Sequence, residues 1–347
     1  MMKKVRIILA IMGLCIASIP AVAQAATPLV LTTGNCPTSL TVNATLKSNV
    51  TCNETININS ANITLNLNGY TLGTTDNRVI IVNRSGFTLT GGTIIVNADD
   101  DGVFAYAVST LDISKVNFIA VCEPCETKGI NIVGVARANV SNSKFSDLTY
   151  GLDSESSSVN LSNSTFYSNY RGFDSYTNSV VNITGSSFTY NTEGIYAVRT
   201  TSLNVSSSKA DYNTQGMYLD ADRYGVVNIN SSFARNNTQN GIQVYDSILA
   251  GKTSSIINTV ASGNGQVGFI VQFPGSMTFK GNLANDNGGD GVYSGNNSGS
   301  DGPLTGSYNS ANNNGGWGLY VQYPVAGTGN TATGNDYDNC FGFVCKR

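Results

Sequence analysis

A glycine recurs along the chain at intervals of 21 to 27 residues, and an apolar residue follows each one. These glycines are Gly129, Gly151, Gly172, Gly194, Gly216, Gly241, Gly268, Gly291 and Gly318. The residues after each glycine tend to alternate between an apolar side chain and a polar or aromatic one, which is the pattern of a short β-strand. A unit of this length cannot bury its apolar face alone and must stack on its neighbours. The repeat therefore predicts an elongated solenoid.

Each unit also carries features between its glycines. Most contain a second short alternating segment, such as "SVNLSNSTF" or "VVNITGSSF". An asparagine precedes the next glycine, as at Asn169, Asn191, Asn213 and Asn237. Asparagine tolerates left-handed backbone angles, and stacked amides can hydrogen-bond from coil to coil. We interpret these asparagines as turn ladders rather than as chemistry.

The first 25 residues have the pattern of an export signal. Basic residues come first, an apolar run from Ile7 to Ile19 is too short to span a bilayer, and Ala23-Gln24-Ala25 provides small residues for cleavage. We therefore expect a signal peptide over 1–25, an N-terminal cap over 26–60 and a solenoid with its C-terminal cap over 61–347. No later segment is long and apolar enough to span a membrane, so we expect a secreted or periplasmic protein without a membrane partner after cleavage.

Net charge and composition limit the classes of partner that we expect. Without the three basic residues of the signal the net charge is about −6, which argues against nucleic acid as a partner. Charged residues are only 12% of the chain, but 41% hydrophobic residues are enough to build a core. We expect a folded, exported protein.

Six cysteines remain after the signal, in three pairs that are close in sequence. They are Cys36 with Cys52, Cys122 with Cys125, and Cys340 with Cys345. An oxidising compartment favours three disulfides. A redox site at "CEPC" is the alternative for one pair, but no helical pattern follows it to stabilise a thiolate. A zinc site would need two distant pairs to meet.

The units, with their "N..G" turns followed by alternating apolar residues, resemble the right-handed parallel β-helix repeats of the pectate-lyase-like superfamily. The resemblance covers about residues 40 to 340 and implies an all-β, single-stranded right-handed parallel β-helix of about 12 coils. Members of that superfamily mostly bind, cleave or epimerise acidic polysaccharides, and others are surface adhesins. The fold alone does not select among these functions.

The chain contains no histidine, which excludes every mechanism that needs one. The superfamily resemblance leaves a lyase as one enzymatic option. In such a lyase an Arg or Lys abstracts a proton, and a Ca²⁺ ion or a second Arg neutralises the carboxylate of the uronate. A two-carboxylate glycosidase is the other enzymatic option. Whether the protein is an enzyme stays open at this stage.

The second and fourth residues after each glycine are expected to point to solvent. Together with neighbouring arginines they form a candidate face. Asp153, Asp174 and Arg171 are its candidate catalytic residues, and Glu155, Tyr176, Tyr196, Arg199, Tyr218 and Tyr245 its candidate substrate-binding residues. Aromatic faces pack on sugar rings and carboxylates accept hydroxyl hydrogen bonds. The alternative is that tyrosine is simply a good strand residue and that Arg171 pairs with Glu193 on the next coil.

Two acidic turns, "NADDDG" at 97–102 and "NDNGGDG" at 285–291, raise the option of calcium. Neither has the ligand spacing of a specific calcium loop, so a solvated turn is the favoured interpretation. The sequence thus predicts an exported β-helix that binds polysaccharide or cell-surface glycan along this face, and it leaves open whether the protein also processes that ligand. The competing hypothesis is a non-catalytic structural or adhesin-like surface protein.

Overall fold

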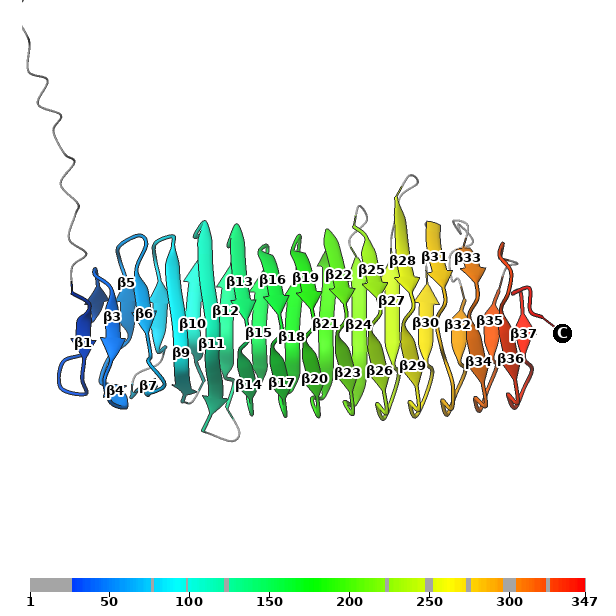
Figure 1. Cartoon of the computed structure of the whole chain (residues 1–347), viewed down its shortest axis with the longest axis horizontal. Coiled ribbons are helices and arrows are strands. Elements are labelled where there is room, and N and C mark those ends of the chain that lie inside the picture. The colour runs from blue at the N-terminus through cyan, green and yellow to red at the C-terminus, as the bar shows by residue number, and fades with distance from the viewer. Residues whose placement is uncertain are drawn as a thin grey trace, which may run out of the picture.

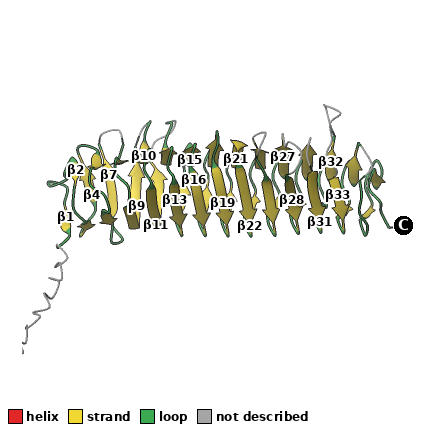
Figure 2. Cartoon of the chain, turned by 90° about the horizontal axis from the view of Figure 1, so that it is seen from above, coloured by secondary structure: helices red, strands yellow, loops and turns green. Residues whose placement is uncertain are grey.

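The computed structural model describes residues 27–75, 78–97, 99–121, 125–221, 225–246, 252–272, 276–295, 304–322 and 325–346. They form a rod of stacked β-coils, with β1 near one end and β37 at the other (Figure 1). The view from above shows the same narrow rod (Figure 2). The described residues contain strands and no helix, so none of their segments is a helix that could cross a membrane. The predicted all-β parallel solenoid is confirmed.

One 14-stranded parallel sheet takes one strand from each successive coil. Its strands are β2 (Ser39–Leu40), β5 (Ile56–Ile58), β8 (Ile80–Val82), β10 (Asp101–Tyr106), β12 (Lys128–Val133), β15 (Tyr150–Glu155), β18 (Arg171–Tyr176), β21 (Glu193–Thr200), β24 (Gln215–Ala221), β27 (Ile242–Asp246), β30 (Phe269–Gln272), β32 (Val292–Ser294), β35 (Leu319–Val321) and β37 (Cys340–Phe341).

The remaining strands form the other sides of the coils. A 21-stranded sheet contains β1 (Leu29–Leu31), β3 (Ala44–Leu46), β4 (Val50–Cys52), β6 (Thr64–Asn66), β7 (Thr71–Thr74), β9 (Phe87–Val96), β11 (Thr110–Ala120), β13 (Arg137–Ser141), β14 (Lys144–Ser146), β16 (Ser158–Ser162), β17 (Thr165–Tyr167), β19 (Val180–Thr184), β20 (Ser187–Thr189), β22 (Ser202–Ser206), β23 (Lys209–Asp211), β25 (Val227–Asn230), β26 (Phe233–Arg235), β28 (Thr253–Ile257), β29 (Val260–Ser262), β31 (Ser276–Lys280) and β33 (Leu304–Ser307). A two-stranded sheet pairs β34 (Ser310–Asn312) with β36 (Thr331–Thr333).

The recurring glycines lie where adjacent coils approach most closely. A Cβ atom on Gly172 would lie 2.7 Å from the carbonyl oxygen of Gly194, and one on Gly151 would lie 2.5 Å from the carbonyl oxygen of Gly172. No real Cβ tolerates such a contact with backbone. The repeated glycines therefore form a column of positions at which any larger residue would prevent the coils from stacking.

The interior is apolar and is itself stacked in columns. Phe173 and Ile195, which the alternation places inward, are fully buried. Phe118, Phe145, Phe166 and Phe188 form a second column of stacked rings with centroids 4.9, 4.5 and 4.7 Å apart. Burial of such large side chains is the main stabilising contribution in a coil this thin.

The asparagines before the glycines form the predicted ladder. The Asn169 Nδ2 atom donates to Asn191 Oδ1 at 2.9 Å, and Asn191 Nδ2 donates to Asn213 Oδ1 at 3.0 Å. The ladder continues through Asn237, Asn264, Asn287, Asn314 and Asn335. Each amide also bonds backbone groups, as Asn169 Nδ2 does with the Phe145 carbonyl. These buried amides are hydrogen-bonded, so their role is structural.

Two of the three predicted disulfides are present, Cys36–Cys52 and Cys340–Cys345. The third prediction includes Cys122, which lies outside the described residues, as does the predicted signal segment 1–25. Within the segment expected to form the N-terminal cap, strands β1 to β5 already join the two large sheets. The first disulfide therefore ties together coils at the start of the rod.

Candidate functional site

The candidate residues lie on the outer face of the 14-stranded sheet, in columns set by strand register. One column runs through Asn131, Asp153, Asp174, Tyr196 and Tyr218 on five successive strands. The residues that precede the glycines form a second column, which contains Asp101, Lys128, Tyr150, Arg171 and Glu193. We call the outer face from Arg78 to Glu193 the charged half, and the face from Tyr196 to Phe341 the aromatic half.

Asp153, on β15, is paired with a residue of the preceding coil. The Lys128 ammonium lies 2.6 Å from Asp153 Oδ2, and the Tyr176 hydroxyl donates to the same oxygen at 3.3 Å. Burial alone would lower the pKa of Lys128, but the hydrogen bond to Asp153 and the charge of that carboxylate outweigh burial and raise this pKa. Lys128 therefore stays charged.

Asp174 and Arg171 lie on β18, one coil further along. Arg171 Nη1 lies 2.9 Å from Asp174 Oδ2, while Arg171 Nε lies 2.5 Å from Glu193 Oε2 on β21. The guanidinium also stacks over Tyr196, 3.8 Å from the ring centroid. Burial raises the pKa of Asp174 to about 6 even though Arg171 attracts the carboxylate.

The expectation that Asp153 and Asp174 are open to solvent is wrong. Each is only 2% exposed, although each occupies an outward position of the pleat. The reason is that ion-paired and hydrogen-bonded side chains of adjacent positions, including Lys128, Arg171 and Tyr176, close over the two carboxyl groups. One oxygen of each carboxyl, Oδ1, is buried without a hydrogen-bond partner among the described residues.

Other candidate residues take different places. The alternative pairing of Arg171 with Glu193 is present, as described above. Glu155 and Tyr176 occupy paired positions at the ends of β15 and β18 and are half-buried. Arg199 is exposed at an irregularity near the end of β21 and makes no ion pair with any described residue.

The candidate tyrosines form a continuous row. The rings of Tyr196 and Tyr218 are stacked with centroids 5.0 Å apart, and Tyr218 lies 5.1 Å from Tyr245. The Tyr245 hydroxyl donates to Gln243 Oε1 at 2.9 Å. Burial raises the pKa of Tyr218 to about 12, with a smaller contribution from Tyr245. The Tyr218 hydroxyl is therefore a neutral donor at physiological pH.

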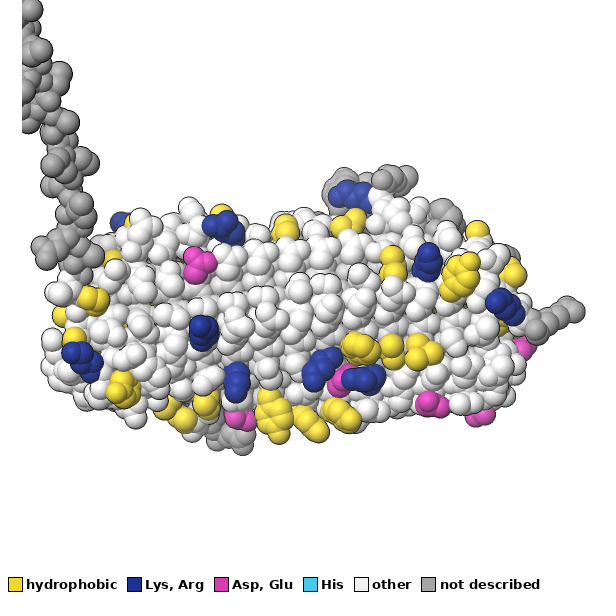
Figure 3. Space-filling view, in the orientation of Figure 1, with side chains coloured by type: hydrophobic (Ala, Val, Ile, Leu, Met, Phe, Trp, Pro, Cys, Tyr) yellow, Lys and Arg dark blue, Asp and Glu magenta, His cyan; other side chains and the backbone are white. Residues whose placement is uncertain are grey.

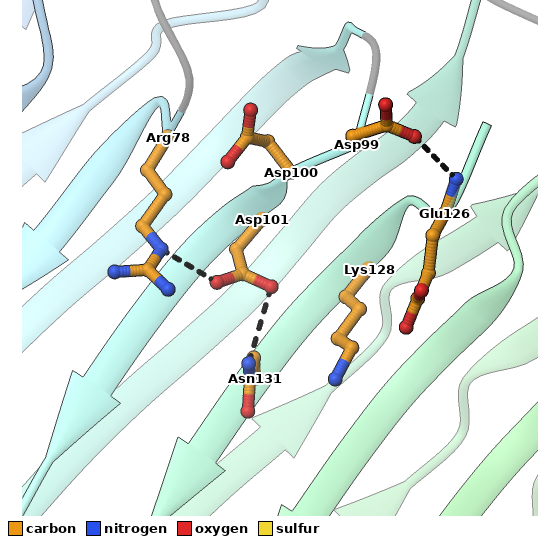
Figure 4. Close-up of a pocket in the computed structure, with 7 residues that line it drawn as sticks. All are labelled: Arg78, Asp99, Asp100, Asp101, Glu126, Lys128 and Asn131. Carbon is orange, nitrogen blue, oxygen red and sulfur yellow. Dashed lines mark hydrogen bonds and ion pairs between the residues drawn. The ribbon is translucent and has the colours of Figure 1, made fainter.

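A cavity of about 300 Å³ at the start of the charged half was not anticipated as a site. Its lining residues are Arg78, Asp99, Asp100, Asp101, Glu126, Lys128 and Asn131 (Figure 4). Arg78 Nε lies 2.8 Å from Asp101 Oδ2, and Asn131 donates to Asp101 Oδ1 at 3.2 Å. Burial raises the pKa of Asp101 against the opposing effect of Arg78. The sequence signal was that Lys128 precedes the repeat glycine Gly129, and that Asp101 precedes Gly102, one coil earlier, which the repeat had not included.

A second unanticipated feature is a cluster of four rings at the end of the rod. Tyr293, Trp317, Tyr320 and Phe341 make ring contacts with centroids 5.3 to 5.7 Å apart. Tyr293 and Tyr320 occupy the column of Tyr196, which is the signal that would have identified them. In the view of Figure 3 most of the surface belongs to neither charged nor hydrophobic side chains, and scattered charges and short rows of hydrophobic side chains stand out from it.

The described residues of the two acidic turns form no cluster of metal ligands. Within the described residues, no group of three or more His, Cys, Asp or Glu side chains is placed to hold a metal ion. Asp99 Oδ1 instead accepts a hydrogen bond from the Glu126 backbone at 3.0 Å. The calcium hypothesis has no structural observation behind it.

Comparisons with known proteins agree with the fold. Residues 128–253 match the family described as "Right handed beta helix region". The structure is similar to the periplasmic alginate epimerase AlgG, with a TM-score of 0.54 and 14% identity over 87% of this chain and 77% of that one. It is also similar to the A-module of the mannuronan C-5 epimerase AlgE4 from Azotobacter vinelandii. There the TM-score is 0.53 at 13% identity, over 88% of this chain and 91% of that one.

No curated protein matches the sequence. At such low identities the likeness to the two epimerases concerns the fold alone. The chain has a right-handed parallel β-helix fold, as the repeat predicted.

Proposed function

We propose that the protein is exported and binds polysaccharide along the outer face of the 14-stranded sheet. The observation that carries the proposal is the row Tyr196, Tyr218 and Tyr245, which presents one ring per coil at spacings of 5.0 and 5.1 Å. Because the rings stack from coil to coil, they turn their faces toward one another and offer a sugar their apolar edges and their hydroxyl groups. The two similar structures are named as alginate and mannuronan epimerases, which supports the same broad ligand class.

Export is supported by chemistry in the chain itself. The Cys36–Cys52 and Cys340–Cys345 disulfides suit an oxidising compartment, and the first residues have the composition of a signal peptide. Both features support a secreted or periplasmic location. Mass spectrometry of protein from the exported fraction, with a mature start near Ala26, is the corresponding measurement.

Binding is favoured over turnover by the state of the carboxyl groups. Asp153 and Asp174 are closed off beneath Lys128 and Arg171, so a scissile bond has no path to either carboxyl unless those ion pairs open. The raised pKa of Asp174, about 6, is the one observation that favours an acid catalyst. An enzyme here would have to be a histidine-independent lyase or a two-carboxylate glycosidase.

The test is a binding panel of soluble polysaccharides measured by affinity electrophoresis, with Tyr218→Ala as the site variant. Loss of one stacking ring should weaken binding by about tenfold, or roughly 1.4 kcal/mol. Tyr167→Ala is the matched control, because Tyr167 is an exposed tyrosine with a neighbouring ring on β17, in the other large sheet. Equal losses in both variants would contradict the proposal.

The competing function, a structural or adhesin-like protein without a sugar site, predicts a different result. No polysaccharide would then be retarded, and both tyrosine variants would behave like the wild type. Product analysis of the same incubations for unsaturated or reducing ends separates binding from turnover, and Asp174→Asn is the variant that should abolish any product.

A further inference from the structure

The tyrosine row does not stop at Tyr245 but continues toward the C-terminal end of the rod. The column of Tyr196 and Tyr218 runs on through Gln243, Ile270, Tyr293, Tyr320 and Phe341. An uncharged side chain occupies every one of these positions. The two aromatic groups are therefore joined by an uninterrupted uncharged track along the rod axis.

The C-terminal ring cluster has the features of a binding platform. Tyr293 and Tyr320 are stacked at 5.4 Å, Tyr320 and Phe341 at 5.3 Å, and Trp317 lies 5.4 Å from Tyr320. Phe341 is 47% exposed. Asp290 Oδ1 accepts a hydrogen bond from the Trp317 backbone at 2.7 Å and so fixes the loop that carries the indole. Tyr293, Trp317 and Tyr320 are half-buried, so the four rings form one contiguous, partly exposed apolar patch, which is a feature of interaction surfaces.

Beyond β21, the described strands of this track offer no positive charge. Strands β24, β27, β30, β32, β35 and β37 contain no Lys or Arg residue. A polymer of uronates needs such partners for its carboxylates, because charged groups that lose water without pairing are strongly disfavoured.

The charged half does not supply them either. Its basic side chains Arg78, Lys128 and Arg171 are each paired with a carboxylate. Acidic side chains outnumber them: Asp99, Asp100, Asp101, Glu126, Asp153, Glu155, Asp174 and Glu193. The exposed Arg199 is a single charge against this excess. The field of the face therefore repels a polyanion.

We infer that the polysaccharide is uncharged, and that it lies over the aromatic half with the cluster Tyr293, Trp317, Tyr320 and Phe341 as a second subsite. This inference rests on the proposed function. A linear neutral polymer is the occupant that fits, because the column is uncharged and continues from the tyrosine row over successive coils. The solved structures of similar fold are named for alginate and mannuronan, which are not the class inferred here.

The experiment compares full-length exported protein on three probes: a linear neutral glucan, alginate and polygalacturonate, each at low and at physiological salt. We expect the neutral glucan to bind with little salt dependence, and both uronates to bind at least about tenfold more weakly at low salt. Trp317→Ala should weaken glucan binding roughly tenfold, while Tyr167→Ala should leave it unchanged. Thermal melts of both variants check that the fold is retained.

Each other outcome has a separate meaning. Retention of no probe at all would contradict the proposed function itself. Preference for either uronate would overturn the inference and leave the proposed function standing. Normal glucan binding by Trp317→Ala would remove the second subsite. Sedimentation in which the wild type is a dimer and Trp317→Ala a monomer would instead assign the cluster to a contact between two copies of the chain.

Discussion

The charged half and the aromatic half share one sheet, one register and one spacing, yet they use the same positions differently. At the outward position after the glycine, the charged half has Asp153 and Asp174, whereas the aromatic half has Tyr196 and Tyr218. The carboxylates are drawn under neighbouring cations, and the rings stack face to face. A β-helix thus repeats the same backbone geometry in every coil. The side chains alone decide whether the outer face of a coil is covered by ion pairs or is available to a ligand.

The difference is also energetic. Buried ion pairs lose hydration on both partners, and the Oδ1 atoms of Asp153 and Asp174 lack a hydrogen bond from any described group. Stacked tyrosines keep their edges hydrated and bury apolar surface. Changes in pH or removal of a basic side chain should therefore strongly change the contribution of the charged half to the free energy of unfolding. The contribution of the aromatic half should change little.

The largest expected effect comes from core substitutions, which test whether the difference between the two halves is limited to their surface. Phe173 lies beneath the charged half and Phe269 beneath the aromatic half, and both are fully buried. Either one changed to alanine should lower the free energy of unfolding by about 3 to 5 kcal/mol, because a cavity replaces a packed ring. Urea denaturation measures both. Values that differ several-fold would show that the two halves differ in the core as well.

The next largest effect is expected from removing the central cation of the charged half. Arg171→Met leaves Asp174 and Glu193 without their shared cation, and should cost about 3 kcal/mol at pH 8. The loss should shrink at pH 5, where protonation of Asp174 removes the uncompensated charge. Arg199→Met is the control, since that exposed side chain should change stability by less than about 0.5 kcal/mol. Equal losses in the two variants would argue against a stabilising Arg171 pair.

A smaller effect concerns the proton on Asp174, whose pKa is raised to about 6 from its usual 3.8. The folded protein holds this proton more tightly than the unfolded chain, so the contribution of this group to stability falls as pH rises from about 4 to about 6. Asp174→Asn removes that fall. Between pH 4 and pH 7, the free energy of unfolding of the variant should rise relative to that of the wild type by an amount on the order of 2 kcal/mol. Parallel stability curves for the two proteins would contradict the shift.

The smallest effect belongs to the aromatic half. Tyr218→Ala removes ring contacts to Tyr196 and Tyr245 on an exposed face and should lower the unfolding free energy by about 1 kcal/mol. This change should be the same at pH 5 and pH 8, which distinguishes it from Arg171→Met. A loss above about 3 kcal/mol would mean that the tyrosine row serves stability and is not reserved for a ligand.

The sequence by itself determined the coil architecture. A glycine every 21 to 27 residues, the inward Phe173 and Ile195, and the asparagine ladder could all be predicted. The reason is that each repeats a local requirement: close backbone approach, alternation across a strand, or a buried amide at a turn. Repetition makes such requirements visible without knowledge of any long-range contact.

Only the tertiary structure decided which members of the candidate face are available. Alternation placed Asp153 and Asp174 outward, but Lys128 reaches over Asp153 from the preceding coil, and Arg171 covers Asp174 from its own strand. The cluster of Trp317 and Phe341 with the distant tyrosines likewise depends on register across coils of unequal length. Strand periodicity fixes the direction of a Cβ atom, whereas the exposure of a functional group depends on the neighbours that stacking brings beside it.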